Sequence, residues 1–135
     1  MREARSRGAR ALVLGLAVVL TACATSNESP EMDAESFYAA FGAEVRSAVR
    51  DLDPDEREQL LDILPRAEFE GATTDVLEVI ATRPGLTPMV RRIERFLETE
   101  PTGSLRLEIR SPQGDRRLWH ILLDTINEEL GREST

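Results

Sequence analysis

The sequence predicts an α+β fold dominated by helices, with about four helices followed by a β-hairpin and a short C-terminal helix. Apolar residues recur at helical spacing between residues 34 and 97, and they alternate with charged residues at 105–110, as in a half-buried strand. A length of 135 residues with 41% hydrophobic residues is enough for one domain with its own core. We place this single small globular domain at residues 34–131.

The first helix is predicted over residues 34–52. Its apolar positions fall on one face at intervals of three and four residues: Phe37, Phe41, Val45, Ala48 and Leu52. Charged residues occupy the other face, which is the pattern of a helix that packs on a core with one side.

The second helix has a clear start. Asp53 suits the N-cap, Pro54 the first helical position, and Glu56 the third, where its side chain closes a capping box. Apolar residues follow at Leu60, Leu61, Ile63 and Leu64. Pro65 is expected to end the helix, because proline has no amide hydrogen to donate.

Two further helices are predicted before residue 101. The third covers residues 74–82, with Val76, Leu77 and Ile80 facing inward, and "RPG" at 83–85 stops it. In the fourth, Thr87 with Pro88 forms the start, and Pro101 follows the end. Its buried edge is expected to comprise Val90, Ile93 and Leu97.

A hairpin is predicted next. Leu105, Leu107 and Ile109 alternate with charged residues, and "SPQG" at 111–114 has serine, proline and glycine at turn positions. A three-residue loop would place Leu107 opposite Trp119 and Leu105 opposite Ile121, so that both strands present one apolar face. Asp124 would then cap a short last helix that ends at Gly131.

An all-α alternative stays open for the same segment. Residues 115–130 also fit one helix, since four apolar residues recur every four positions: Leu118, Leu122, Ile126 and Leu130. Short apolar runs fit either period, so the pattern alone does not decide between them.

The N-terminus has the composition of a secretory signal. Four arginines in the first ten residues precede an apolar run at 11–20 and the small residues Thr21 and Ala22. The run is about half as long as a membrane span, which takes about 20 residues. We therefore expect residues 1–22 to be a signal peptide that is removed.

The residues "LTAC" at 20–23, which include the only cysteine of the chain, resemble the lipobox of bacterial lipoproteins. The resemblance covers residues 1–23 and implies cleavage between Ala22 and Cys23. It also implies a diacylglycerol on the Cys23 sulfur and often a further acyl chain, such as palmitate, on the new amino group. Two or three acyl chains would hold the protein on a bilayer, so the lipid bilayer is the first expected partner.

The anchor would be followed by a short tether. Residues 23–33 form the lipidated N-terminus and a polar, proline-containing segment, and residues 132–135 form a polar tail. Ala24 occupies the position after the cysteine, where lipoproteins of this class that stay in the inner membrane commonly have aspartate. The resemblance therefore implies an exported protein on the periplasmic face of the outer membrane, if the organism has two membranes.

The mature chain would be strongly acidic. The formal charge of the whole chain is −8, and without residues 1–22 there remain 13 basic and 24 acidic residues, a net charge of −11. Such a domain repels phosphate backbones, which argues against nucleic acid as a partner. Basic protein surfaces and cations stay possible as partners.

Two groups of charged residues are candidate sites. The first is the acidic run at 51–62, which places four carboxylates as in a calcium-binding loop, at Asp51, Asp53, Asp55 and Asp62. Glu56 stands where that loop needs glycine, so helix capping explains the same residues more simply. The second is an arginine group on the fourth helix, a candidate interaction patch formed by Arg91, Arg92 and Arg95.

The sequence offers no catalytic motif. His120 is the only histidine, and no serine stands in a nucleophile elbow, so we assign no catalytic residue, no metal and no cofactor. The leading hypothesis is a non-enzymatic lipoprotein of the cell envelope that binds or scaffolds another envelope protein. The alternatives are a small carboxylate-dependent hydrolase acting on envelope polymers and a weak cation-binding module.

Overall fold

The computed structural model describes residues 32–132, and this part of the chain is all-α. It contains six α-helices and one 3-10 turn: α2 (Ala34–Arg50), α3 (Pro54–Ala67), α4 (Thr73–Ile80), η2 (Pro84–Leu86), α5 (Thr87–Thr99), α6 (Gly103–Arg110) and α7 (Pro112–Glu129). Since no strand is present among these residues, the predicted α+β fold with a hairpin is wrong.

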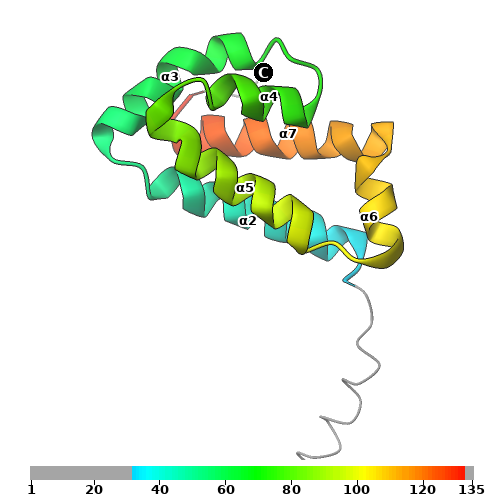
Figure 1. Cartoon of the computed structure of the whole chain (residues 1–135). Coiled ribbons are helices and arrows are strands. Elements are labelled where there is room, and N and C mark those ends of the chain that lie inside the picture. The colour runs from blue at the N-terminus through cyan, green and yellow to red at the C-terminus, as the bar shows by residue number, and fades with distance from the viewer. Residues whose placement is uncertain (1–31, 133–135) are drawn as a thin grey trace, which may run out of the picture. The chain divides into compact units, whose positions relative to one another are not determined.

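The helices pack around α7, which runs through the middle of the bundle (Figure 1). The helix α2 lies along α7, and α5 packs on α2. On the other side, α4 contacts α7 and is covered by α3, while α6 turns across the N-terminal end of α7. All six helices of the described part contribute to one hydrophobic core.

The predicted stripe of the first helix is confirmed in α2. Phe37, Phe41, Val45 and Ala48 are buried. The helix ends at Arg50, two residues before the predicted end, so Leu52, which packs partly buried against the core, lies outside it. The Phe37 ring stacks on Phe96 of α5 with 5.5 Å between ring centroids. Burial of these rings on one face of α2 explains why the helical period was readable in the sequence.

The predicted start of α3 is also confirmed. Asp53 is the N-cap, its Oδ1 accepts the amide hydrogen of Glu56 at 2.8 Å, and the Glu56 carboxylate accepts the amide hydrogen of Asp53 at 3.0 Å. Pro65 does not end the helix as predicted, because α3 continues to Ala67. Because proline has no amide hydrogen, the carbonyl of Leu61 receives no helical hydrogen bond from Pro65. Leu61 is exposed, so water can satisfy this carbonyl and the helix tolerates Pro65 in its last turn.

The α4 to α5 connection differs in detail from the prediction. α4 ends at Ile80, and "PGL" forms the 3-10 turn η2 between the two helices. Leu86, in a helical backbone conformation, takes the N-cap position of α5, so Thr87 does not cap and is the first helical residue. The 3-10 turn leads directly into α5, which explains why a separate extended cap residue is not needed.

The first predicted strand is the helix α6. Leu105 and Ile109 are buried, whereas Leu107 between them is 72% exposed. Leu105 and Ile109 are four residues apart, which places them on one helical face, and the same two positions also satisfy an alternating pattern. The alternation therefore came from one exposed leucine and did not reflect a strand face.

The predicted turn "SPQG" starts α7 instead. Ser111 is the N-cap and accepts the amide hydrogen of Gly114 at 3.1 Å, with Pro112 in the first turn. Serine and proline suit both a turn and a helix start, which explains the error. The structure has the single helix of the all-α alternative, beginning three residues earlier than residue 115, and Asp124 lies inside it instead of capping a further helix.

Residues 1–31 and 133–135 lie outside the described part of the chain. The predicted signal peptide, the cleavage site, the lipidated Cys23 and the tether up to residue 31 fall there. Among residues 32–132, no helix combines the length and the hydropathy needed to cross a bilayer.

Candidate functional site

A groove of about 580 Å³ opens between α4, α5, α6 and α7. Its floor is apolar, and four side chains from the four helices contribute to it: Leu77, Leu97, Ile109 and Leu118. Its rim is polar, with Thr74 from α4, Glu94 and Glu98 from α5, and Arg110 from the end of α6. An apolar floor with a few charged groups at the edge is the usual composition of a binding site.

A close contact between α6 and α7 fixes one end of the groove. A Cβ atom on Gly114 would lie 2.2 Å from the carbonyl oxygen of Glu108, so only glycine allows this approach. Ser111 adds a hydrogen bond from its Oγ to the same carbonyl at 2.6 Å. These contacts place Ile109 and Arg110 at the edge of the groove.

Two hydrogen bonds join α4 to α7 beside this contact. The amide of Thr73 donates to Oδ2 of Asp115 at 3.3 Å, and the Thr73 hydroxyl donates to the Asp115 carbonyl at 3.1 Å. Since Ala72 at the N-cap of α4 has no side-chain oxygen, Asp115 of α7 supplies the capping carboxylate. Asp115 is therefore engaged in joining α4 to α7.

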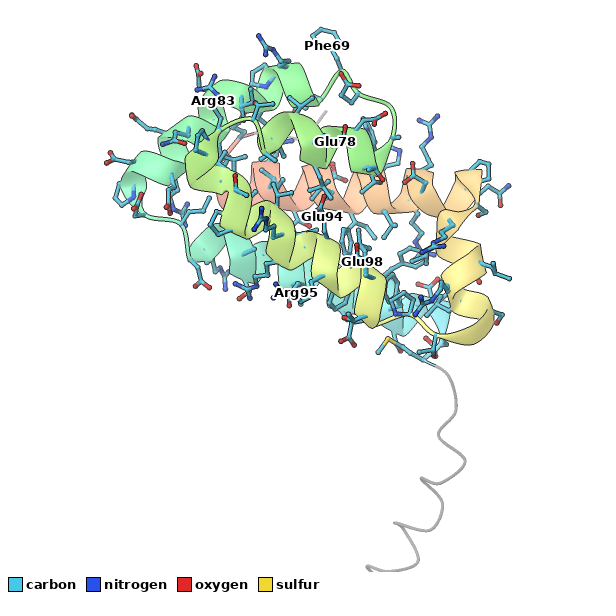
Figure 2. The ribbon with its side chains drawn as sticks, viewed as in Figure 1. Phe69, Glu78, Arg83, Glu94, Arg95 and Glu98 are labelled. Carbon is cyan, nitrogen blue, oxygen red and sulfur yellow. The ribbon has the colours of Figure 1, made fainter. Side chains whose placement is uncertain are left out.

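The α5 wall of the groove carries two carboxylates. Glu94 and Glu98 are four residues apart, so they lie on the same side of the helix, as Figure 2 shows. Every ion pair within the described residues uses other acids: Glu35, Glu44, Asp51, Asp62, Glu68, Glu128 and Glu129. Within residues 32–132, Glu94 and Glu98 thus form no ion pair, and both line the groove.

The arginines of the predicted patch have different surroundings. Arg92 is engaged with α2: it donates to Glu44 at 2.7 Å, to Asp51 at 2.8 Å and to Ser47 at 2.7 Å. These hydrogen bonds raise the pKa of Arg92 further above its ordinary value. Arg91 and Arg95 are exposed on the outer side of α5, beside a shallow depression that also includes Pro88.

The four acidic residues proposed as a weak cation site serve several separate roles. Asp51 follows α2 and pairs with Arg92, Asp53 caps α3, and Asp62 pairs with Arg83 at 2.6 Å. Asp55 lies in the first turn of α3, where its negative charge interacts favourably with the helix dipole. Within residues 32–132, no group of three potential metal ligands is brought together.

Ion pairs between α2 and α7 hold the two longest helices together. Glu129 accepts hydrogen bonds from Arg50 at 2.9 Å and from Arg46 at 3.0 Å, and these bonds lower the pKa of Glu129. Near the other end, Arg117 pairs with both oxygens of Glu35 at 2.9 and 2.7 Å, which lowers the pKa of Glu35. These pairs are structural, because they join residues 79 to 83 positions apart on two packed helices.

His120 lies exposed on α7, with its ring edge-on to Trp119 at 5.0 Å between centroids. Trp119 donates from Nε1 to the carbonyl of Glu70 at 2.7 Å, which joins α7 to the loop after α3. Neither residue lines the groove.

The chain was compared with protein-family models, with curated proteins and with solved structures, and none of the three comparisons found a match.

Glu94 and Glu98 were not among the residues predicted for a site. Their spacing of four residues and the neighbouring Leu97 are visible in the sequence, but the same segment also contains the three arginines of the predicted patch. The missing information was the position of α6, because Ile109 and Arg110 complete the groove only when residues 103–110 form a helix.

Proposed function

We propose that the protein is a lipid-anchored, non-enzymatic component of the cell envelope that binds another envelope protein through its helical domain. The observation that carries the proposal is the "LTAC" sequence at 20–23 behind an arginine-rich, apolar leader. Acyl chains on Cys23 and a tether of about ten residues, at most about 35 Å long, would keep the domain near the bilayer.

The groove supports binding more than catalysis. A general acid at neutral pH needs a carboxyl group with a raised pKa. The contacts of Asp33, Glu35 and Glu129 act in the opposite direction, because hydrogen bonds lower the pKa of each. None of the three lines the groove. No observation therefore favours the hydrolase alternative.

Photo-crosslinking in cells tests this function. We would place a photoreactive amino acid at Thr74, which is exposed on the rim of the groove, and at Glu58, which is exposed on α3, as the matched control. We expect one envelope protein to crosslink to position 74 and not to position 58.

The anchor is tested in the same cells with Cys23→Ser. Since this substitution also removes the lipobox, we expect the variant to lack acyl chains and to keep its leader, so that intact mass spectrometry gives a chain without the added acyl mass that still includes residues before position 23. A variant that carries the same acyl mass as the parent would contradict the proposal, and so would the absence of any partner at position 74.

A further inference from the structure

We propose that the groove between α4, α5, α6 and α7 binds a cationic amphipathic segment of a partner protein, with apolar side chains on the floor and basic side chains against Glu94 and Glu98. This inference rests on the proposed function, because it gives the chemistry of the partner. The occupant is inferred from the match between the apolar floor, the charge of the α5 wall and the charge of the whole domain.

The floor of the groove offers an apolar surface. Leu97 of α5 is only partly buried, and it lies in the groove with the buried Leu77, Ile109 and Leu118 of three other helices. The groove has a volume of about 580 Å³, within the range of about 300–1,000 Å³ that is usual for ligand sites. An apolar face presented by a helix or a short extended segment is the protein ligand that fits such a floor.

The α5 wall of the groove carries two carboxylates that are unpaired within the described residues. Glu94 and Glu98 stand one helical turn apart, and within residues 32–132 neither has a cationic partner. None of the arginines of α5 lines the groove: Arg92 binds Glu44 and Asp51, and Arg91 and Arg95 are exposed on the outer side of the helix. α5 thus presents only its two carboxylates to the groove, and a ligand with basic groups at the spacing of one turn would balance their charge.

Two features of the groove would favour a ligand of the opposite charge. Arg110 on the rim and the N-terminus of α4 would attract an anion. The amide of Thr73 at that N-terminus already donates to Asp115, so one acceptor is in place there. Glu94 and Glu98 then exceed Arg110 in charge. The mature chain with its expected net charge of −11 would also draw basic partners and repel acidic ones.

Binding of a designed peptide tests the inference. The probe is a fluorescent amphipathic helical peptide of about 14 residues made of leucine and lysine, and its counterpart has glutamate in place of lysine. The full chain is measured in neutral detergent micelles by fluorescence anisotropy, with empty micelles subtracted. We expect saturable binding of the lysine peptide that weakens as ionic strength rises. We expect no saturable binding of the glutamate peptide.

Variants assign the binding to the groove. The double substitution Glu94→Gln with Glu98→Gln is expected to lower the affinity for the lysine peptide about fivefold or more. The matched control is Asp55→Asn with Glu58→Gln, which removes two carboxylates lining a separate depression on α3 and is expected to leave affinity within about twofold. Arg110→Gln is expected to tighten binding, since it removes the one basic group of the rim.

Several results would overturn the inference. Equal affinity in the Glu94/Glu98 and Asp55/Glu58 variants would place binding elsewhere on the acidic surface. If the glutamate peptide binds more tightly than the lysine peptide, and Arg110→Gln weakens its binding, the occupant of the groove is anionic. If the lysine peptide does not bind while position 74 still crosslinks to an envelope protein, the chemistry proposed for the groove is wrong and the proposed function stands.

Discussion

Nε of Arg92 on α5 lies 2.7 Å from Oε2 of Glu44 on α2, and the two helices pack against each other. The same guanidinium also reaches Asp51 and Ser47, so it joins α5 to three positions of the α2 segment. An arginine engaged in this way acts as a structural group, whereas Arg91 and Arg95 project from the outer side of the helix.

We predict that Arg92→Ala lowers the free energy of unfolding by about 1 kcal/mol, the magnitude of a partly exposed ion pair with added hydrogen bonds. Arg95→Ala, the control on the same helix, should change it by less than about 0.5 kcal/mol. Urea denaturation followed by circular dichroism measures both. Equal effects of the two substitutions would show that Arg92 does not join the helices.

Gly114 tests the contact that closes the groove. We predict that Gly114→Ala destabilises the fold by about 3 kcal/mol, because the added Cβ would overlap the Glu108 carbonyl and would force α6 away from α7. Gly42→Ala is the control. Gly42 lies inside α2, and a Cβ there would be 3.5 Å from Ile121 of α7, an ordinary contact distance. Alanine should therefore stabilise α2 by about 0.5 kcal/mol. A Gly114→Ala protein as stable as the parent would contradict the close approach of α6 and α7.

Leu105 and Leu107 distinguish the helix α6 from a strand. In the structure Leu105 is 5% exposed and Leu107 is 72% exposed. Leu105→Ala should therefore cost about 2–3 kcal/mol, and Leu107→Ala less than about 0.5 kcal/mol. In the predicted hairpin both side chains share one face. If thermal denaturation shows similar losses of stability for the two variants, the hairpin is favoured.

Glu129 predicts a dependence of stability on pH. Hydrogen bonds from Arg50 and Arg46 lower its pKa from the usual 4.5 in the folded protein. A lowered folded pKa contributes stability above pH 4.5, and this contribution is lost as pH falls through the folded pKa. Glu129→Gln should therefore melt at a lower temperature than the parent at pH 7, with the difference shrinking in acid.

The matched control for this series is Glu58→Gln, which removes one exposed carboxylate from α3 that is in no ion pair of the described residues. A difference between the Glu129→Gln protein and the parent that stays constant from pH 7 into acid would show that the ion pair with Arg50 does not contribute.

The helices with strong local signals could be predicted from the sequence, whereas after residue 100 the pattern left a hairpin and a helix open and the hairpin was the wrong choice. The stripe of α2 and the capping box of α3 depend on neighbours within one or two helical turns, so they are visible in the sequence. At 105–110 the local pattern fits two periods, and only packing of Leu105 and Ile109 against the core selects the helix.

The groove depended on that same region. Glu94, Leu97 and Glu98 could be recognised as one side of a helix. Ile109 lies in a segment that was predicted as a strand, and Leu118 in one for which a strand and a helix both stayed open. Contacts between residues far apart in the chain, such as Thr73 with Asp115, leave no local pattern in a single sequence.

The mass of the native protein tests the central claim most directly, because the compartment, the charge of the mature domain and the class of partner all depend on Cys23. Intact mass spectrometry of protein extracted from membranes should give a chain that begins at Cys23 and carries the added mass of two or three acyl chains. A chain that retains Met1 with an unmodified Cys23 would contradict the account.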